Sequence, residues 1–220
     1  MGNRWINLEG LHMKKLFTVL TMFVAALLMT ACGGNTAQDT KAAPAKTETA
    51  STQTTPATDS KTLIVYFSAQ GHTKQLAETT SKALGADLVE IVSKEPYTAH
   101  DLDYNDKTTR ATVEQNNPAA RPAIANKIEN MAQYNTVIIA YPIWWAQEPR
   151  IVDTFVESYD FTGKTLVPFC TSGGSDIGRS GEALAALTTG AATWKDGKRF
   201  APTASADEIA DYFKSIGVTQ

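Results

Sequence analysis

The sequence predicts an α/β domain in which a five-stranded parallel sheet carries helices on both faces. Three apolar, β-branched-rich runs show no polar alternation, which is typical of strands buried on both faces of a parallel sheet: 62–68, 136–141 and 165–170. Segments with helical periodicity alternate with these runs, and such alternation favours a three-layer sandwich with right-handed crossovers. Ligands of such folds bind at the carboxyl ends of the strands.

The first half of this domain is expected to contain two strands and two helices. In order, the patterns predict a strand at 62–68, a helix at 73–84, a strand at 87–92 and a helix from Pro122 to Ala132. Gly85 stands just past the first helix, as a helix-ending residue does. Glu90 interrupts the apolar residues of the second strand and places it at the sheet margin. Residues 93–117 are polar and without pattern, so we expect a long connection that covers something or is mobile.

The second half continues the alternation. The patterns predict a strand at 136–141, a helix at 149–159, a strand at 165–170, a helix near 178–187, a weak strand near 193–200 and a last helix after Ser205. Ser205 and Glu208 form a capping box at the start of the last helix, and Gly217 ends it.

The N-terminal region has the pattern of an export signal. Two lysines precede a 14-residue uncharged and mostly apolar run at 16–29, shorter than the ~20 residues of an ordinary transmembrane helix. Met29-Thr30-Ala31-Cys32 resembles the lipobox of bacterial lipoproteins. We therefore expect residues 1–31 to be a signal peptide cleaved before a lipidated Cys32. A plain secretory signal with a coincidental cysteine is the alternative, and Met13 is an alternative start.

Composition separates a linker from the folded domain. Residues 33–60 contain no aromatic residue, Val, Leu, Ile or Met, so they cannot bury enough apolar surface to fold. We expect residues 32–60 to be a lipid-anchored, disordered linker and residues 61–220 to be the domain. The domain carries 15 basic and 19 acidic residues, a formal charge of −4.

Charge and cysteine content disfavour two other classes of protein. The only basic cluster is Lys14-Lys15, so the sequence lacks the electrostatic pattern of a nucleic-acid-binding protein. The two cysteines cannot form a disulfide framework, and no Cys/His spacing matches a zinc site, so we expect no metal. Cys170, in a core strand, is interpreted as a small buried hydrophobe.

Three loops at the predicted strand ends carry the candidate chemistry. Ser68-Ala69-Gln70-Gly71-His72-Thr73 leads from a strand into a helix N-terminus, where free amides and hydroxyls suit an anion such as phosphate. The loop has no Lys or Arg, and it matches neither the P-loop pattern nor the G-x-G-x-x-G fingerprint. A hydroxyl-rich helix cap without a ligand is the simpler interpretation of this loop alone.

The second loop is rich in large aromatic residues. Tyr141-Pro142-Ile143-Trp144-Trp145 continues to Pro149 at a strand end, where solvated residues are the default. Either the tryptophans fill the gap between loop and helix, or they form a wall against which a flat heteroaromatic ring packs. The third loop, Thr171-Ser172-Gly173-Gly174-Ser175, allows close backbone approach to a ligand. Together the three loops indicate a mononucleotide with a large planar ring.

Residues 61–220 resemble the flavodoxin-like family, which binds flavin mononucleotide (FMN), and especially its branch with a Tyr-Pro-Ile-Trp-Trp loop. The resemblance implies FMN as cofactor and a three-layer sandwich with strand order 2-1-3-4-5. The family's phosphate loop is usually Ser/Thr-x-Thr-Gly-Asn-Thr, so Gln70 and His72 depart from it. By position, the implied cofactor-binding residues are Ser68, Gln70, Gly71, His72, Thr73, Tyr141, Pro142, Ile143, Trp144, Trp145, Thr171, Ser172, Gly173, Gly174 and Ser175.

The resemblance implies a redox protein that transfers electrons. It is either an electron carrier or an FMN-dependent oxidoreductase of quinones or NAD(P)H, and neither requires a catalytic side chain. A domain anchored outside the cytoplasmic membrane meets little NAD(P)H, which favours a carrier whose partner is a quinone or an exported redox protein. Its contact with the membrane is expected through the lipid anchor only, and the sequence does not indicate its oligomeric state.

The sequence also bears on two further classes of protein. A signalling receiver domain has similar topology but needs acidic residues where Ser68 and Tyr141 stand, so it is disfavoured. A non-redox binding lipoprotein with a vestigial flavin site is the remaining alternative, because Gln70 and His72 depart from the family pattern.

Overall fold

A computed structural model of the protein describes residues 61–218. The expected signal peptide, the lipidation site Cys32 and the linker at 32–60 lie outside the described residues. Within residues 61–218, no helix combines the length and the apolar character that crossing a membrane requires.

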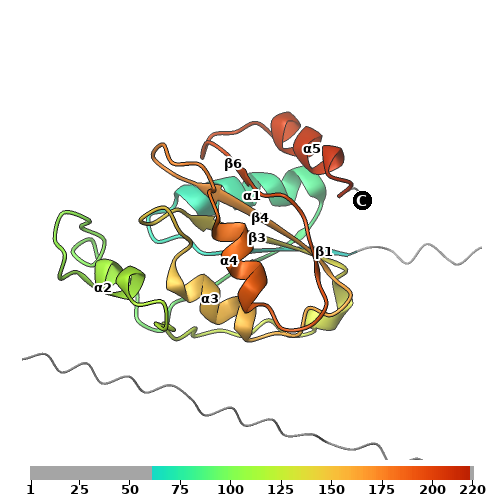
Figure 1. The fold of residues 1–220 in the computed structure, drawn as a ribbon. Coiled ribbons are helices and arrows are strands. Elements are labelled where there is room, and N and C mark those ends of the chain that lie inside the picture. The colour runs from blue at the N-terminus through green and yellow to red at the C-terminus, as the bar shows by residue number, and fades with distance from the viewer. Residues whose placement is uncertain (1–60, 219–220) are drawn as a thin grey trace, which may run out of the picture. The chain divides into compact units, whose positions relative to one another are not determined.

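Strands and helices alternate along the described chain (Figure 1). The elements are β1 (Thr62–Tyr66), α1 (His72–Leu84), β2 (Asp87–Glu90), α2 (Arg110–Asn116), the short 3-10 helix η1 (Met131–Gln133), β3 (Thr136–Pro142), α3 (Arg150–Glu157), β4 (Thr165–Thr171), α4 (Ser180–Leu187), β5 (Thr193–Trp194), β6 (Lys198–Arg199) and α5 (Ala206–Ser215). The strands form one parallel sheet in the order β2-β1-β3-β4-β5, and β6 also pairs with β4. The expected fold class and strand order are confirmed.

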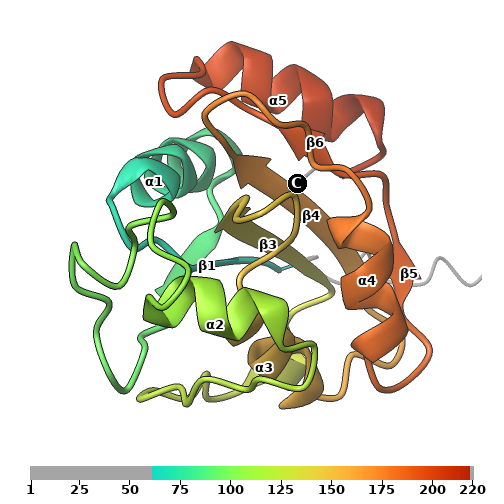
Figure 2. The same ribbon diagram turned by 60° about the vertical axis from the view of Figure 1, so that its left-hand side comes forward.

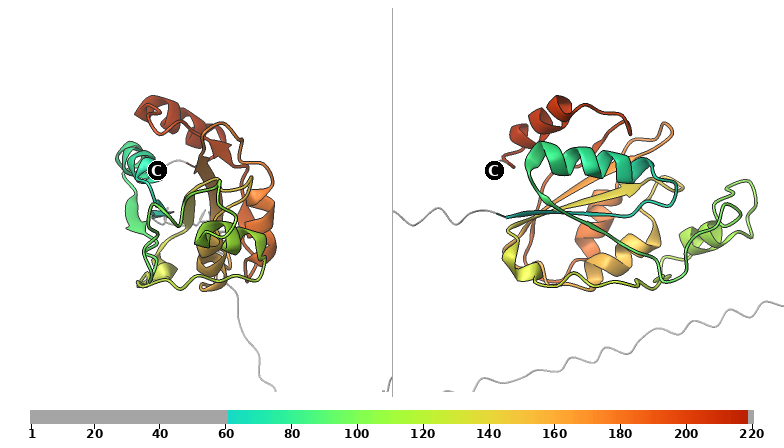
Figure 3. Two further views of the ribbon diagram at one scale, coloured as in Figure 1. Left: turned by 90° about the vertical axis from the view of Figure 1, so that its left-hand side faces the viewer. Right: turned by 180° about the vertical axis from the view of Figure 1, so that it is seen from behind.

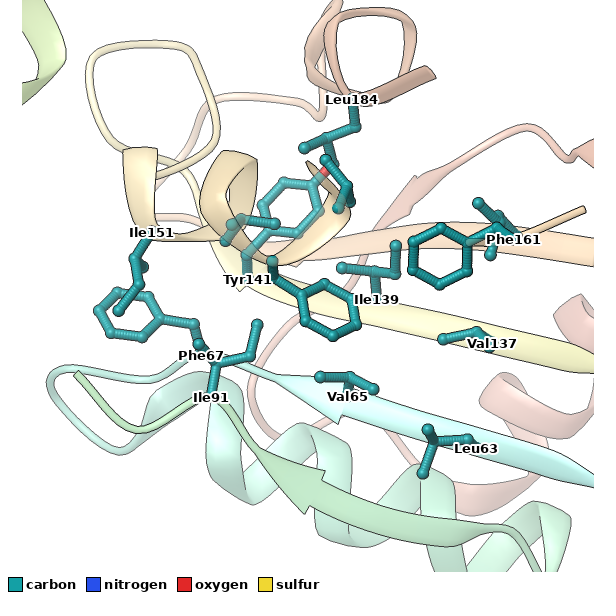
Figure 4. Close-up of a cluster of buried hydrophobic side chains, with 14 of the residues drawn as sticks. Leu63, Val65, Phe67, Ile91, Val137, Ile139, Tyr141, Ile151, Phe161 and Leu184 are labelled. Atoms are coloured by element: carbon teal, nitrogen blue, oxygen red, sulfur yellow. The ribbon is translucent and has the colours of Figure 1, made fainter. Parts of the chain in front are cut away.

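Helices cover both faces of the sheet, α1 and α5 on one and α3 and α4 on the other (Figure 2). Successive residues of β1 alternate between the two cores. Leu63 and Val65 belong to the core on the α3 side (Figure 4), whereas Ile64 packs with Leu76 of α1. Because both faces of β1 are buried, its sequence lacks polar alternation.

The helix expected from Pro122 to Ala132 is not formed, and only η1 at its end is helical. The segment runs beside the residues that follow β2, with an isolated bridge between Ser93 and Ile124. Strand β2 itself stops at Glu90, two residues before its expected end. The Asn126 side chain donates to the Glu90 carbonyl oxygen (2.8 Å) and accepts from the Val92 amide (3.0 Å). A side chain that bonds to the backbone of a neighbouring segment competes with helix formation, which explains why the apolar spacing was misleading.

Helix α2 lies instead within 93–117, where the sequence predicts a polar connection. Its buried residues are Ala111, Thr112 and Gln115, and because two of the three are polar, hydrophobic periodicity does not reveal the helix. Figure 3 shows α2 beyond the carboxyl ends of the central strands, apart from the helices that cover the sheet. This position brings it to the edge where ligands of such folds bind.

The weak strand expected at 193–200 is divided into β5 and β6. The carbonyl oxygens of Leu166 and Cys170 in β4 both accept hydrogen bonds of 2.9 Å from this edge segment. The intervening Pro168 faces the same edge because orientation alternates along a strand. Proline has no N–H to donate, so the ladder is interrupted there.

Candidate functional site

Three loops meet at the carboxyl edge of the sheet and line one cavity of about 280 Å³. They follow β1, β3 and β4, which are neighbours in the sheet, so their ends lie side by side. The lining residues are Ser68, Ala69, Gln70, His72, Thr73, Pro142, Ile143, Trp144, Thr171, Ser172, Gly173 and Pro202. The volume is just below the usual range of small-molecule sites, roughly 300–1,000 Å³.

The loop after β1 is shaped by local interactions. Gly71 adopts a φ of 89°, in the left-handed region that favours glycine, and its amide donates to Ser68 Oγ at 3.1 Å. Helix α1 begins at the next residue and has no acidic side chain in its first turn. The first amides of a helix lack intrahelical partners and carry a positive dipole, so this end of the cavity suits an anion.

Two buried hydroxyls connect the first loop to the third. Thr73 Oγ1 and Thr171 Oγ1 are 2.8 Å apart and share a hydrogen bond, although 98 residues separate them in sequence. The Ile143 amide donates to the Thr171 carbonyl oxygen at 2.8 Å, which also ties the second loop to the third. These bonds fix the loops at the place where all three strands end.

The glycines of the third loop leave space open. A Cβ atom added to Gly173 or Gly174 would meet no protein atom within 4 Å. Ser172 Oγ accepts from the Gly174 amide at 3.3 Å and also donates to the Ser175 carbonyl oxygen. The loop therefore holds its shape by its own hydrogen bonds while its backbone stays accessible to a ligand.

Trp144 forms a wall of the cavity in the second loop. Its ring packs edge-on against Phe67, with centroids 5.6 Å apart, and against Tyr97, at 5.3 Å. Both interpretations of the aromatic loop therefore apply to Trp144: its ring packs against other side chains of the protein, and it also lines the cavity. Trp145 is 38% exposed and lies outside the cavity lining.

Tyr141 points into the core (Figure 4). It is fully buried, and its hydroxyl shares a hydrogen bond of 2.9 Å with Ser180 Oγ of α4. Of the residues that the family resemblance implies, ten line the cavity. Tyr141 does not, because it belongs to β3 and its side chain is part of the core. The other four are in the same loops but outside the lining: Gly71, Trp145, Gly174 and Ser175.

Two lining residues were missed by the sequence analysis. Ala69 lies inside the first loop and has no side-chain chemistry that marks it. Pro202 lies between β6 and α5. It is distant in sequence from the three loops, and only the tertiary fold brings it to the cavity. Neither position has a local sequence signal.

The cavity lining contains one titratable side chain, His72, and no carboxylate. An anion bound there is therefore held by amides and hydroxyls without repulsion from an acidic neighbour in the lining. Burial raises the pKa of the nearby Cys170 thiol to about 12, which keeps it neutral and fits its interpretation as a small buried hydrophobe.

A family profile described as Flavodoxin matches residues 61–216. The chain belongs to the flavodoxin family. FMN is the cofactor of this family, and the match covers almost all of the part of the chain that the structure describes. The comparison with curated proteins gave no match.

Solved structures agree with the flavodoxin assignment. A Bacteroides eggerthii protein, provisionally described as a flavoprotein, is 44% identical with a TM-score of 0.70, and the match covers 73% of this chain and 100% of that one. A second such protein, from Bacteroides uniformis, is 37% identical with a TM-score of 0.62, covering 70% and 98% of the two chains. A Lactobacillus acidophilus flavoprotein in complex with FMN shares the fold at 20% identity and a TM-score of 0.51, with coverage of 70% and 99%.

Proposed function

We propose that this flavodoxin-family protein binds FMN in the cavity at the strand ends and transfers electrons outside the cytoplasmic membrane. The observation that carries the proposal is the convergence of the three loops on one cavity. One end of that cavity offers helix amides and hydroxyls, and the other offers the ring of Trp144. This polarity matches a ligand with a phosphate at one end and a planar ring at the other.

The residues present fit FMN. The amides at the start of α1, with the hydroxyls of Ser68 and Thr73, would hold the phosphate. Trp144 and the backbone at Gly173 would hold the ring, and the open space beside the glycines of the third loop leaves room for it. FMN supplies the capacity to take up one or two electrons, and the protein's contribution is binding, orientation and control of solvent access.

The place of action follows from the N-terminal sequence. We propose that the chain is cleaved before Cys32, anchored by lipid on that residue and held off the membrane by residues 33–60. In such a location its electrons come from a membrane quinol or from another exported redox protein.

A second function is favoured by one observation. Gln115 of α2 contacts the backbone of the second loop, so residues 93–117 lie beside the candidate flavin site. An FMN-dependent oxidoreductase needs a surface there for a quinone or a nicotinamide. Steady turnover of NAD(P)H or a quinone by the purified protein without a partner would favour this oxidoreductase over the carrier.

The test is an FMN titration of the full chain purified in detergent, followed by visible absorption and flavin fluorescence. Thr73→Val removes the hydroxyl shared with Thr171 and is expected to weaken FMN binding about tenfold, the factor for one lost hydrogen bond to a charged group. Riboflavin, which lacks the phosphate, should lose less affinity than FMN does in Thr73→Val.

Thr80→Val is the matched control for Thr73→Val. Thr80 is buried in the same helix, and its hydroxyl donates to the Leu76 carbonyl oxygen at 2.8 Å, away from the cavity. It should leave FMN affinity unchanged. Absence of FMN binding by wild type at millimolar concentration would contradict the redox proposal and leave the vestigial-site alternative. Loss of membrane association in Cys32→Ser tests the anchor separately.

A further inference from the structure

The second loop contains a tight turn in an unfavourable backbone conformation. The Trp144 amide donates to the Gln147 carbonyl oxygen (2.9 Å), and the Gln147 amide donates to the Trp144 carbonyl oxygen (3.0 Å). Between them, Trp145 and Ala146 have φ values of 47° and 61°. Two successive left-handed residues define a type I′ turn, which strongly favours Asn and Gly. A turn made from Trp and Ala therefore needs support from the surrounding structure.

Gln115 of α2 supplies support at both sides of this turn, which we call the tryptophan turn (Trp144–Gln147). Its side-chain amide donates to the carbonyl oxygens of Trp144 (3.0 Å) and Glu148 (3.1 Å). Gln115 is only 5% exposed, so these bonds form away from water. The two bonds bracket the turn and connect it to a helix about thirty residues earlier in sequence.

Arg150, the first residue of α3, ties the same parts together from the other side. Its Nη2 donates to the Gln115 carbonyl oxygen (3.1 Å) and to Gln147 Oε1 (2.7 Å). Its Nη1 donates to Asp153 Oδ2 at 3.1 Å, which anchors the guanidinium on α3. Arg150 thus joins α2, the tryptophan turn and α3 in one buried network.

This network is not the most stable way to fill the space. Glu148 and Asp153 are both fully buried and share Arg150, and burial raises the pKa of both carboxyl groups. Several of its polar atoms have no hydrogen-bond partner within residues 61–218: Gln115 Oε1, both Glu148 carboxylate oxygens, Arg150 Nε and Asp153 Oδ1. Buried charges are costly, so a well-packed apolar cluster would stabilise the fold at least as well.

We infer that Gln115 and Arg150 are positioning residues that hold the tryptophan turn so that Trp144 stays in place as a wall of the ligand cavity. Tyr97, from the same 93–117 segment, packs edge-on against the Trp144 ring and also contacts Phe67. Residues 93–117 therefore form part of the site, because Gln115 binds the tryptophan turn and Tyr97 packs against the Trp144 ring. The inference that this serves ligand binding rests on the proposed FMN function, whereas the effect on the turn itself does not.

Gln115→Met is the variant that tests this role, because it keeps the length of the side chain and removes both donated hydrogen bonds. Lys164→Met is the matched control: Lys164 is also buried, and its ammonium donates to the Tyr134 carbonyl oxygen at 2.6 Å, at the start of β4 and away from the cavity. Both variants are made in the full chain, in detergent. Amide hydrogen exchange at Trp144 and Gln147 is measured without ligand, and affinities are measured for FMN and riboflavin.

Gln115→Met should accelerate exchange at these two amides about tenfold relative to Lys164→Met. It should weaken FMN and riboflavin binding by the same factor, about tenfold, because the turn positions the ring wall and not the phosphate loop. Arg150→Lys keeps the charge but cannot reach all the partners of a guanidinium, and it should have the same effects.

Unchanged exchange at Trp144 and Gln147 in a folded Gln115→Met protein would overturn the positioning role. Faster exchange with unchanged FMN affinity would also overturn it, because the network would then not serve the site. If Gln115→Met does not fold, Arg150→Lys, which leaves Gln115 in place and removes the guanidinium bonds to it and to Gln147, decides between these results. Absence of flavin binding by wild type would contradict the proposed function, while the exchange result would still decide whether the turn is held.

Discussion

The phosphate-type loop (Ser68–Thr73) and the tryptophan turn (Trp144–Gln147) form two ends of one cavity but are held in different ways. Within the first loop, Ser68 Oγ accepts a hydrogen bond from the Gly71 amide, and the residue with left-handed backbone conformation is Gly71 itself. The tryptophan turn places Trp and Ala in left-handed conformations and depends on Gln115 and Arg150. The first loop is stabilised mainly by its neighbours in sequence, the second by distant ones.

This difference has a consequence for function. The first loop makes its distant bond to Thr171 of β4, in the sheet itself, and none of its bonds involves α2, which suits a constant ligand group such as phosphate. A turn held by a separate helix can be adjusted by changes in that helix, without altering the sheet or the phosphate end. We therefore expect changes in α2 to alter the ring end of the cavity more than the phosphate end.

The largest effect is expected from Trp144→Ala. The half-buried ring packs against both Phe67 and Tyr97, which also contact each other, and its removal enlarges the cavity, so the free energy of unfolding should fall by about 2–4 kcal/mol. Urea denaturation measures this fall. Trp145→Ala is the control, because its side chain is 38% exposed and should cost far less. Equal losses in the two variants would mean that Trp144 is not anchored by the segment containing Tyr97.

The next largest effect is a pH dependence of the free energy of unfolding. It comes from Glu148, the residue that follows the tryptophan turn. Burial raises the pKa of Glu148 to about 7, opposed by Arg150 and reinforced by Asp153. A carboxyl group whose pKa is higher in the folded state binds its proton more tightly there, so the folded state loses stability as pH rises from about 4.5 to 7. The free energy of unfolding of wild type should fall over this range, on the order of 1–2 kcal/mol.

Glu148→Gln should flatten that dependence, since it cannot ionise. The difference between wild type and Glu148→Gln reports on the buried pair of Glu148 and Asp153, because the titrations of groups away from this pair are common to both proteins. Parallel curves of unfolding free energy against pH would show that Glu148 keeps an ordinary pKa. Glu157→Gln is a suitable control, because the hydrogen bond from Arg121 lowers the pKa of that carboxyl group and removes its titration from the range.

Gly71→Ala tests the first loop. A Cβ atom at this position meets no protein atom within 4 Å, but the φ of 89° is unfavourable for alanine. The expected loss of stability is about 1–2 kcal/mol, from backbone strain alone. Amide exchange in the tryptophan turn should remain at the wild-type rate. Faster exchange there would mean that the two ends of the cavity are coupled.

The smallest effect is expected from Ala146→Gly. Ala146 is exposed and has a φ of 61°, so glycine relieves strain in the turn while adding freedom to the unfolded chain. The net stabilisation should be a few tenths to about 1 kcal/mol, visible as a higher melting temperature. A lower melting temperature would contradict the view that the turn is held against its own preference.

Sequence patterns were sufficient for the parts of the molecule that depend on local chemistry or on full burial. The apolar strands β1, β3 and β4 were predicted because burial on both faces leaves a continuous apolar run. The loop at Gly71 was predicted because hydroxyls, a glycine and a helix start are adjacent in sequence. Once those strands were placed in a parallel sheet, the meeting of the three loops followed from topology.

The remaining parts depend on long-range contacts between polar groups. The buried face of α2 includes Gln115, whose partners are backbone carbonyls in another loop, and no hydrophobic period marks such a face. The segment at 122–130 was predicted to be helical from the spacing of its apolar residues. That spacing does not reveal the hydrogen bonds of the Asn126 side chain to the backbone at the end of β2. Pro202 joins the cavity lining for a similar reason.

The most direct test is a backbone amide NMR titration of the protein with FMN. FMN in the cavity should shift the amides of Gly71, His72 and Thr73 together with the Trp144 indole and the Gly173 amide, with one common affinity. Riboflavin should shift the last two but not the first three. Shifts confined to the other cavity of about 280 Å³, beside Ile128 and Tyr159, or no shifts at saturating FMN, would contradict the assignment of the site.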